Sequence, residues 1–191
     1  MQRRSGRGLM HRIRFGETVM RRFMFRLAVL SALVLLAGCV SRPVAEDGAT
    51  YVVVRHAEKA SDDPRDPSLS ELGRKRVERL VDRLHYDALV AVYATGYRRS
   101  RQTGEPIAQD HGLPLSSYDA AQPAAEFAAL LRRQHPAGTV LIVAHSDTMA
   151  PIAQALCGCA IAPTSDSEYG RRIAVTVLPD GRTTVDDRRE P

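Results

Sequence analysis

The sequence predicts an α/β fold, a three-layer α/β/α sandwich built around a mostly parallel sheet. Short apolar runs without alternation, which are typical of strands buried on both faces, recur along the chain. Segments with helical spacing of apolar residues separate these runs, and such alternation is typical of a parallel sheet covered by helices on both faces. The turn sequence Pro179-Asp180-Gly181 lets two further strands form an antiparallel edge near the C-terminus.

The first half of the domain begins with an expected strand at residues 51–54, which is apolar, largely β-branched and followed directly by Arg55 and His56. After a loop rich in Asp and Pro, Ser70 is expected to cap a helix. The apolar residues of this helix recur at helical spacing: Val77, Leu80, Val81 and Leu84. A second buried strand is expected at 88–94.

A further helix is expected after the loop 95–101, running to about His111, with Pro106 bending or restarting it. A weak strand at 113–118 follows. Pro123 then suits the first turn of the next helix, because a missing N–H costs little there.

The cleanest buried strand is expected at 139–144. Thr148 is expected to cap the helix that follows, with Pro151 in its first turn, and this helix should run to about Leu156. The last two strands flank the C-terminal turn, at residues 173–178 and 183–185.

Residues 1–38 are expected to be a signal peptide, because arginines crowd positions 3–26 and an apolar run follows at 27–37. That run has about ten residues, whereas a membrane-spanning helix needs roughly 20, so a retained transmembrane helix is the weaker interpretation. The run ends at Leu36-Ala37-Gly38-Cys39, which resembles the bacterial lipobox, where the cysteine is acylated and becomes the mature N-terminus.

Two alternatives stay open for this end: an ordinary signal peptide with an incidental cysteine, and a translation start at Met10, Met20 or Met24. Neither changes the expected compartment, the cell envelope. By resemblance to Gram-negative lipoproteins, Val40 favours sorting to the outer membrane, with the protein on its periplasmic face. Residues 39–50 would then form a lipidated tether, and residues 51–191 one domain.

Removal of residues 1–38 changes the charge balance, because it takes away eight arginines and one glutamate. The 19 basic and 21 acidic residues that remain give a net charge of −2. The mature chain therefore carries no basic excess, and nucleic acid is not an expected partner.

Cys157 and Cys159 are the cysteines other than Cys39. An oxidising compartment permits a bridge between them, but the ring would be small and strained. Free thiols packed at a helix end are therefore the preferred prediction. A metal site would need more ligands than this pair supplies.

Three of the predicted strands lead into basic or imidazole side chains. These are Arg55 and His56 after the first strand, Arg98, Arg99 and Arg101 after the second, and His145 after the strand at 139–144. In open α/β sheets the ligand crevice lies beyond the carboxyl ends of the strands, so these groups are expected to converge. Guanidinium and imidazole groups in one cleft favour a small dianion, of which phosphate is the simplest.

Four ordered motifs contain these residues: Arg55-His56-Ala57-Glu58, Leu69-Ser70-Glu71-Leu72-Gly73, Arg99-Ser100-Arg101-Gln102-Thr103 and Ala144-His145-Ser146-Asp147-Thr148. They resemble the Arg-His-Gly-Glu, Leu-Thr-x-x-Gly, Arg-Ala-x-Gln-Thr and Gly-His-Ser-Asn-Thr patterns of the histidine phosphatase superfamily, in its phosphoglycerate mutase-like branch. The resemblance runs from about residue 51 to 185 and implies a phosphoglycerate mutase-like fold.

The resemblance implies a phosphatase that works by double displacement, with no metal and no other cofactor. His56 would attack phosphorus to give a phosphohistidine, which water then hydrolyses. Arg55, Arg99 and His145 would hold the phosphoryl oxygens and stabilise the transition state. The substrates would be phosphomonoesters or other phosphorylated small molecules or proteins.

The same resemblance selects Arg99 among three neighbouring arginines, because it stands three residues before Gln102. Arg98 and Arg101 are then expected to be rim residues or salt-bridge partners. Glu58 is expected either to orient the His56 loop or to be a helix-start carboxylate.

Two departures from the family patterns bear on activity. Relatives often protonate the leaving group with a carboxylic acid, and the candidates here are Asp119, Asp147 and Glu126. Without such an acid, substrates with good leaving groups, such as acyl phosphates, are favoured. Ala57 replaces a glycine and puts a methyl group where the backbone approaches the site.

Three other functions stay open. A phosphomutase would use the same chemistry, although the chain has little spare length for a lid. A non-catalytic anion-binding lipoprotein would keep the arginines on the same fold. A hydrolytic metal site would use His56, His145 and a carboxylate. The physiological substrate and the oligomeric state are not predicted.

Overall fold

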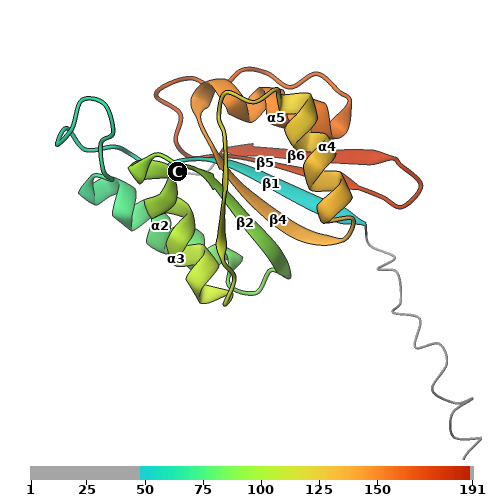
Figure 1. Cartoon of the computed structure of the whole chain (residues 1–191), viewed down its shortest axis with the longest axis horizontal. Helices are drawn as coiled ribbons and strands as arrows, with labels where there is room; N and C mark the ends of the chain where they lie inside the picture. The colour runs from blue at the N-terminus through green and yellow to red at the C-terminus, as the bar shows by residue number, and fades with distance from the viewer. Residues whose placement is uncertain (1–47, 190–191) are drawn as a thin grey trace, which may run out of the picture. The chain divides into compact units, whose positions relative to one another are not determined.

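The structure is a computed structural model that describes residues 48–189 (Figure 1). The expected signal peptide at 1–38, the expected lipidation site Cys39 and most of the expected tether lie outside the described residues. Within residues 48–189, no helix combines the length and the apolar character needed to cross a membrane.

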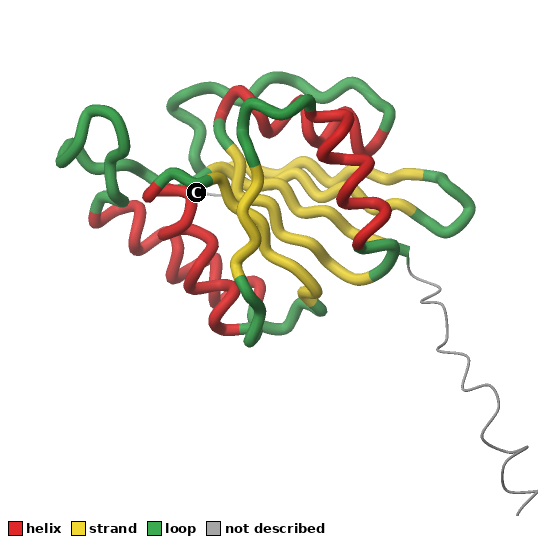
Figure 2. The backbone as a smooth tube through the Cα atoms, viewed as in Figure 1, coloured by secondary structure: helices red, strands yellow, loops and turns green. Residues whose placement is uncertain are grey.

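A six-stranded sheet with the order β3-β2-β4-β1-β5-β6 forms the centre of the domain (Figure 2). The strands are β1 (Ala49–Arg55), β2 (Leu89–Thr95), β3 (Leu115–Tyr118), β4 (Gly138–Ala144), β5 (Arg171–Val177) and β6 (Thr183–Arg189). Strands β3, β2, β4 and β1 pair in parallel, whereas β5 pairs antiparallel with both β1 and β6. The predicted parallel sheet with an antiparallel C-terminal edge is confirmed.

Helices cover both faces of this sheet (Figure 1). On one face lie α2 (Glu71–Leu84) and α3 (Arg98–Asp110). On the other lie α4 (Ala124–Gln134) and α5 (Ser146–Cys157). The predicted three-layer sandwich is therefore confirmed.

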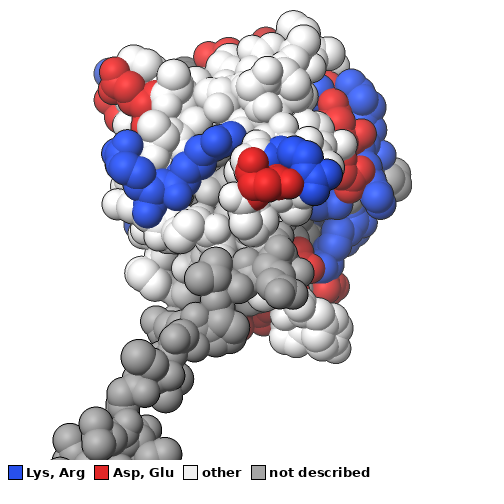
Figure 3. All heavy atoms as spheres, turned by 90° about the vertical axis from the view of Figure 1, so that its right-hand side faces the viewer, with Lys and Arg blue, Asp and Glu red and all other residues white. Residues whose placement is uncertain are grey.

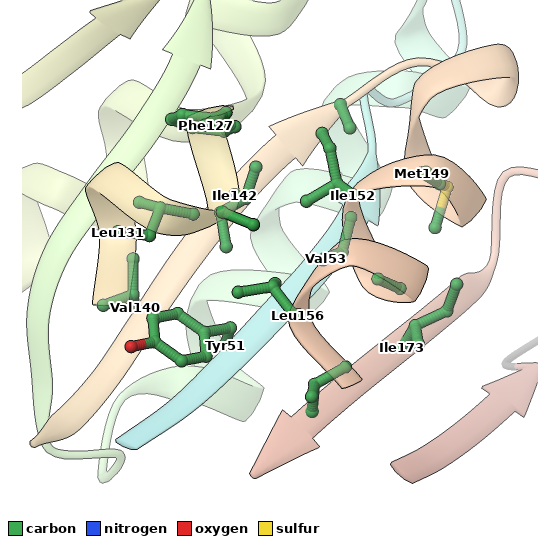
Figure 4. Packing of buried hydrophobic residues seen from close by; sticks show 14 of the residues in the cluster. Tyr51, Val53, Phe127, Leu131, Val140, Ile142, Met149, Ile152, Leu156 and Ile173 are labelled. Atoms are coloured by element: carbon green, nitrogen blue, oxygen red, sulfur yellow. The ribbon is translucent and has the colours of Figure 1, made fainter. Parts of the chain in front are cut away.

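Alternate residues of β1 contribute to two separate cores. Tyr51 and Val53 pack with residues of α4 and α5, as Figure 4 shows. Val52 and Val54 belong to the core beneath α2 and α3. All four side chains are buried, which explains why the strand reads as a continuous apolar run. Burying a side chain of this size contributes about 1.5–3 kcal/mol, so β1 anchors both helical layers.

The folded domain starts earlier than the tether prediction allowed. Ala49 and Thr50 belong to β1, where they pair with Gly138 and Thr139 of β4. Thr50 also lies 3.0 Å from Thr176 on β5 through their hydroxyl groups. The expected tether at residues 39–50 is thus wrong at its C-terminal end. Its small and polar residues hid the start of the strand from an apolar pattern.

The start of α2 was predicted correctly, whereas the start of α5 was not. Ser70 caps α2 and its hydroxyl accepts a hydrogen bond from the Gly73 N–H at 3.1 Å. Thr148, however, is the third residue of α5, and its hydroxyl accepts from the N–H of the true cap, His145, at 3.0 Å. Threonine can serve at either position, because both satisfy free N–H groups. Pro151 consequently lies in the second turn and not in the first.

The remaining boundaries differ by smaller amounts. Pro106 lies inside α3, which continues across it without restarting, and Pro123 is the cap of α4 and precedes its first turn. Strand β6 is longer than the predicted 183–185. The prediction stopped short because the second half of the strand is charged and carries no apolar signal. Because β6 is an edge strand that pairs only with β5, its charged side chains can remain in the sheet.

Cys157 and Cys159 form a disulfide, so the preferred prediction of free thiols was wrong. Gly158 between them adopts a left-handed conformation with φ of 66° at the end of α5. This turn brings the two Cα atoms to 5.2 Å, within the ordinary range for a bridge.

Charged side chains of both signs share the surface shown in Figure 3, where acidic groups lie beside basic ones. The same mixing occurs along β6, where Asp186 pairs with Arg172 and Arg188 at 3.3 and 2.7 Å.

Candidate active site

The four candidate residues from the sequence converge where β1, β2 and β4 end. Arg55 is the last residue of β1 and His56 follows it. His145 follows β4 and caps α5, and Arg99 lies in the first turn of α3, just after β2. Because β4 lies between β1 and β2 in the sheet, these carboxyl ends are neighbours.

Together they line a cleft of about 380 Å³. Its lining consists of Arg55, His56, Lys59, Tyr97, Arg99, Ala120, His145, Ser146, Asp147, Thr148 and Asp166. The lining contains three basic side chains, two imidazoles and two carboxylates. The predicted convergence is found for Arg55, His56, Arg99 and His145, whereas Arg98 and Arg101 are not part of the lining.

His56 is held with one ring nitrogen unprotonated. Its backbone N–H donates to the Ala144 carbonyl at 2.9 Å, which fixes the residue against the end of β4. Its Nδ1 lies 2.8 Å from the Ala57 carbonyl oxygen. Since a carbonyl only accepts, Nδ1 carries the proton and Nε2 holds a lone pair.

The electrostatics keep His56 neutral. Burial is the main cause that lowers its pKa to about 3, and the nearby His145, Arg99 and Arg55 act in the same direction. An uncharged imidazole with a free Nε2 is the form that a nucleophile needs.

Arg99 contacts this unprotonated nitrogen directly. Its Nε donates to Nε2 of His56 at 3.2 Å. The guanidinium also stacks 4.4 Å from the ring centre of Tyr97, and its NH1 lies 3.8 Å from Asp66. The cation is thereby fixed in orientation on two sides.

His145 faces His56 edge-on, with 5.2 Å between the ring centres. Its Nε2 lies 2.9 Å from the hydroxyl of Thr95, the last residue of β2. Burial, reinforced by Arg99 and Arg55, lowers the pKa of His145 to about 4. Both imidazoles are therefore neutral at neutral pH.

Arg55 is buried, and a segment that the sequence did not single out holds it. Its NH1 donates to the carbonyl groups of Ser165, Asp166 and Glu168 at 3.3, 2.6 and 3.4 Å. Tyr169 stacks on the guanidinium at 4.0 Å. Asp166 also lines the cleft, although it lies in an irregular stretch that carried no motif or periodicity.

The spacing of residues in the Arg99–Thr103 motif has a structural explanation. The hydroxyl of Thr103 accepts from the Ala57 N–H at 3.0 Å and donates to the Arg99 carbonyl at 2.7 Å. The side chain of Gln102 accepts from the Leu69 N–H at 2.8 Å. The helix that carries Arg99 is thus linked to the loop that carries His56.

The motif at residues 69–73 supports the same loop from α2. The Glu58 carbonyl accepts from the Ser70 N–H at 2.8 Å. A Cβ added to Gly73 would lie 2.3 Å from that carbonyl oxygen, so only glycine fits. The Glu58 carboxylate binds Arg76 on α2 at 2.9 and 3.1 Å. Glu58 therefore braces the loop, and the helix-start alternative was wrong.

Other sequence candidates lie at or beyond the rim. Arg98 pairs with Asp62 at 3.6 Å, which confirms it as a salt-bridge partner. Arg101 is exposed and is not part of the cleft lining. The methyl group of Ala57 packs with Leu69 and Val77 and does not line the cleft, so the expected intrusion into the site was wrong.

The three proton-donor candidates are placed differently. Asp147 is exposed and lines the cleft beside His145. Asp119 accepts from the Ala121 N–H at 2.9 Å and does not line the cleft, although its neighbour Ala120 does. Glu126 is exposed in the first turn of α4 and is also absent from the lining.

Asp166 is an additional carboxylate that the sequence did not reveal. Its Oδ1 accepts from the Ser146 hydroxyl at 2.5 Å and lies 3.9 Å from the Arg55 NH2. The Ser146 hydrogen bond, with Arg55 second, lowers the pKa of Asp166. Asp166 is therefore ionised and poorly suited to donate a proton. In residues 48–189, no three His, Cys, Asp or Glu side chains are placed to share a metal ion.

Residues 51–122 match the family model of the histidine phosphatase superfamily, branch 1. The matched part of the chain is similar to this superfamily. The matched segment holds Arg55, His56 and Arg99, whereas His145 lies beyond it. A comparison with curated proteins gives no match.

Two solved phosphatase structures share the fold. The protein histidine phosphatase SixA complexed with tungstate is 19% identical, with a TM-score of 0.58 over 73% of this chain and 96% of that chain. The mycobacterial glucosyl-3-phosphoglycerate phosphatase complexed with VO3 is 15% identical, with a TM-score of 0.60 over 74% of this chain and 99% of that chain. At these identities the likeness establishes the phosphoglycerate mutase-like fold that the sequence predicted.

Proposed function

We propose that this protein is a phosphohydrolase in which His56 is the nucleophile. The observation that carries the proposal is the state of Nε2 of His56: it is unprotonated, buried and 3.2 Å from the Nε of Arg99. Arg55 and His145 line the same cleft. This arrangement can bind a phosphoryl group and attack it from one face.

The reaction proceeds in two displacements. Nε2 forms a bond to phosphorus while the bond from phosphorus to the leaving oxygen breaks, and the leaving oxygen takes up a proton. Water then attacks phosphorus, loses a proton and breaks the bond to Nε2, which releases phosphate and restores His56. Arg55 and Arg99 stabilise the charge on the phosphoryl oxygens in both steps.

Asp147 is the proton donor in this proposal. It is the one carboxylate among the three sequence candidates that lines the cleft, and it is exposed to solvent. Substrates whose leaving group needs no proton would turn over without it.

The substrate class is a phosphomonoester or another phosphorylated small molecule or protein. Solved structures with this fold include a protein histidine phosphatase and a glucosyl-3-phosphoglycerate phosphatase. The first is named for a protein substrate and the second for a small molecule. The shared element is the phosphoryl group, and it is the part that Arg55 and Arg99 recognise.

We also propose that the mature protein is lipid-anchored through Cys39, on the periplasmic face of the outer membrane. The basic residues, apolar run and lipobox-like end of 1–38 support this location. The Cys157–Cys159 disulfide supports an oxidising compartment. Labelling with a radioactive fatty acid tests the anchor, with label expected on the wild type and lost in Cys39→Ser.

The experiment that tests the activity uses the chain from Cys39 onward with p-nitrophenyl phosphate and acetyl phosphate in excess EDTA, with and without vanadate. Vanadate-sensitive release that resists EDTA and is lost in His56→Ala is expected. Release that EDTA abolishes would point to a metal-dependent hydrolase. Phosphate binding without any release would point to the anion-binding alternative.

A further inference from the structure

The orientation of Arg55 depends on the segment 162–169, which lies between α5 and β5. Three of its carbonyl groups accept hydrogen bonds from NH1 of Arg55, and Tyr169 stacks on the guanidinium. The Arg55 side chain is only 4% exposed, so these contacts, and not solvent, determine where its remaining donors point. A shift of this segment would therefore move Arg55.

The start of this segment is held by Arg171, the first residue of β5. NH1 of Arg171 donates to three oxygens in succession: the Ala162 carbonyl at 2.9 Å, the Pro163 carbonyl at 3.0 Å and the Thr164 hydroxyl at 2.9 Å. One guanidinium nitrogen thus fixes three consecutive residues.

Arg171 is in turn held by Asp187 on β6. Its Nε and NH2 donate to the two carboxylate oxygens at 2.9 and 2.7 Å, a bidentate pair. Arg171 is 1% exposed, and the hydrogen bonds that it donates to Asp187 raise its pKa in spite of burial. Without the Asp187 charge, Arg171 would be a buried cation lacking its counter-ion.

A second contact ties the other end of the segment to the same strand. The Glu168 carboxylate lies 2.5 Å from the Nε of Arg189 on β6. The segment 162–169 is therefore attached to β6 at both ends, through Arg171–Asp187 and Glu168–Arg189.

We propose that Arg171 and Asp187 are a positioning pair for phosphate binding: they fix the segment 162–169, which aims Arg55 at the phosphoryl group. Neither residue lines the cleft, so both act through Arg55 and do not touch substrate. The inference rests on the proposed phosphohydrolase function, because the aim of Arg55 matters only if an oxyanion binds there.

The test compares Asp187→Asn with the matched control Asp186→Asn. Asp186 is the preceding residue on β6 and also pairs with arginines, Arg172 and Arg188, neither of which is Arg171. We expect Asp187→Asn to raise the KM for p-nitrophenyl phosphate and the Kd for vanadate by about tenfold, because small misplacement of a phosphate ligand is costly. Asp186→Asn should change neither by more than about twofold.

A double mutant separates positioning from general destabilisation. In an Arg55→Ala background, the Asp187→Asn change should have no further effect on vanadate affinity, since its route to the cleft is gone. An equal loss in both backgrounds would overturn the proposal. Melting temperatures are recorded for every variant, and all assays are run well below the lowest of them.

The other anchor provides a second test if Asp187→Asn does not fold. Glu168→Gln removes the contact with Arg189 and should raise the vanadate Kd severalfold, and an unchanged Kd would overturn the proposal. A wild type that neither hydrolyses nor binds vanadate would overturn the proposed function itself. An active wild type with Asp187→Asn equal to Asp186→Asn would overturn the positioning role alone.

Discussion

Arg99 donates a hydrogen bond from its Nε to Nε2 of His56 over 3.2 Å. The acceptor is the lone pair that the proposed mechanism uses, because the other ring nitrogen is engaged by the Ala57 carbonyl. The cation that would bind the phosphoryl group is thus already next to the atom that would attack it. A bound phosphoryl group must take over this hydrogen bond from Arg99 before Nε2 can attack, so binding and attack involve the same two side chains.

Replacing Arg99 by alanine should lower kcat/KM for p-nitrophenyl phosphate by about 10²–10³, the range seen when one electrostatic donor is lost. Arg101→Ala is the control, since this arginine lies on the same helix but is exposed and outside the cleft lining. Its kcat/KM should stay within about twofold of wild type. Equal losses in the two variants would show that general positive charge, and not the position of Arg99, matters.

The pH dependence of activity should reflect the lowered pKa of His56. Because the folded protein holds this pKa at about 3, the imidazole remains neutral and nucleophilic well below pH 6.5. The pH at which kcat/KM declines on the acid side should therefore lie below the ordinary pKa range of histidine. Steady-state kinetics from pH 4 to 8 with acetyl phosphate measure it, and an acid limb centred at 6.5 would contradict the buried, neutral state.

The lowered pKa of His56 also predicts how the free energy of unfolding varies with pH. The unfolded chain has an ordinary histidine pKa of 6.5 and binds protons more readily than the folded protein below that value. The stability linked to neutral His56 is complete above pH 6.5 and is lost as pH falls from 6.5 towards 3. Melting temperatures between pH 7.5 and 4 should fall less steeply in His56→Gln than in wild type.

Much of the fold could be predicted because its signals are local. The apolar run of β1 and the Ser70 cap identify elements without reference to the rest of the chain. The second half of β6 could not be found, since Asp186 and Asp187 are charged and their roles depend on partners on β5. Threonine at position 148 fitted two cap positions equally well.

The residues of the site also fall into two groups: those that a local sequence signal identifies and those that depend on tertiary contacts. His56 and Arg99 could be predicted because each follows a buried strand within a short motif. Asp166 and Tyr169 could not, because they reach Arg55 only through tertiary contacts more than a hundred residues away in sequence. The Cys157–Cys159 bridge could not be predicted either, because it depends on the left-handed backbone conformation of Gly158 between the two cysteines.

The proton donor can be identified from the leaving-group dependence of the rate. Asp147→Asn should lower kcat strongly for an alkyl phosphate and little for acetyl phosphate, because only the alkoxide needs protonation. Asp119→Asn serves as the control, since Asp119 does not line the cleft. If Asp119→Asn instead showed the leaving-group dependence, the assignment of Asp147 would be wrong.

Gly73→Ala should destabilise the domain by about 1–3 kcal/mol, the usual cost of overpacking. The added Cβ would lie 2.3 Å from the Glu58 carbonyl oxygen, which is backbone and cannot swing away. Gly96→Ala is the control, because nothing lies within 4 Å of its Cβ position. Urea unfolding measures both, and equal midpoints would contradict the close contact between α2 and the His56 loop.

Removal of the disulfide should affect stability more than catalysis. Cys157→Ser opens a very small loop, so the expected loss is about 1–2 kcal/mol of unfolding free energy. The kinetics should be nearly unchanged, since neither cysteine lines the cleft. A large drop in kcat/KM, measured alongside urea unfolding, would show that the bridge influences the site.

The most direct test of the central claim is to trap the phosphorylated enzyme. The chain from Cys39 onward is mixed with labelled acetyl phosphate, quenched within milliseconds in base, and digested for mass spectrometry, with His56→Ala treated in parallel. The mechanism predicts a base-stable, acid-labile phosphoryl group on the peptide that contains His56, forming and decaying at rates consistent with turnover. A phosphoryl group on another residue, or turnover that persists in His56→Ala, would contradict it.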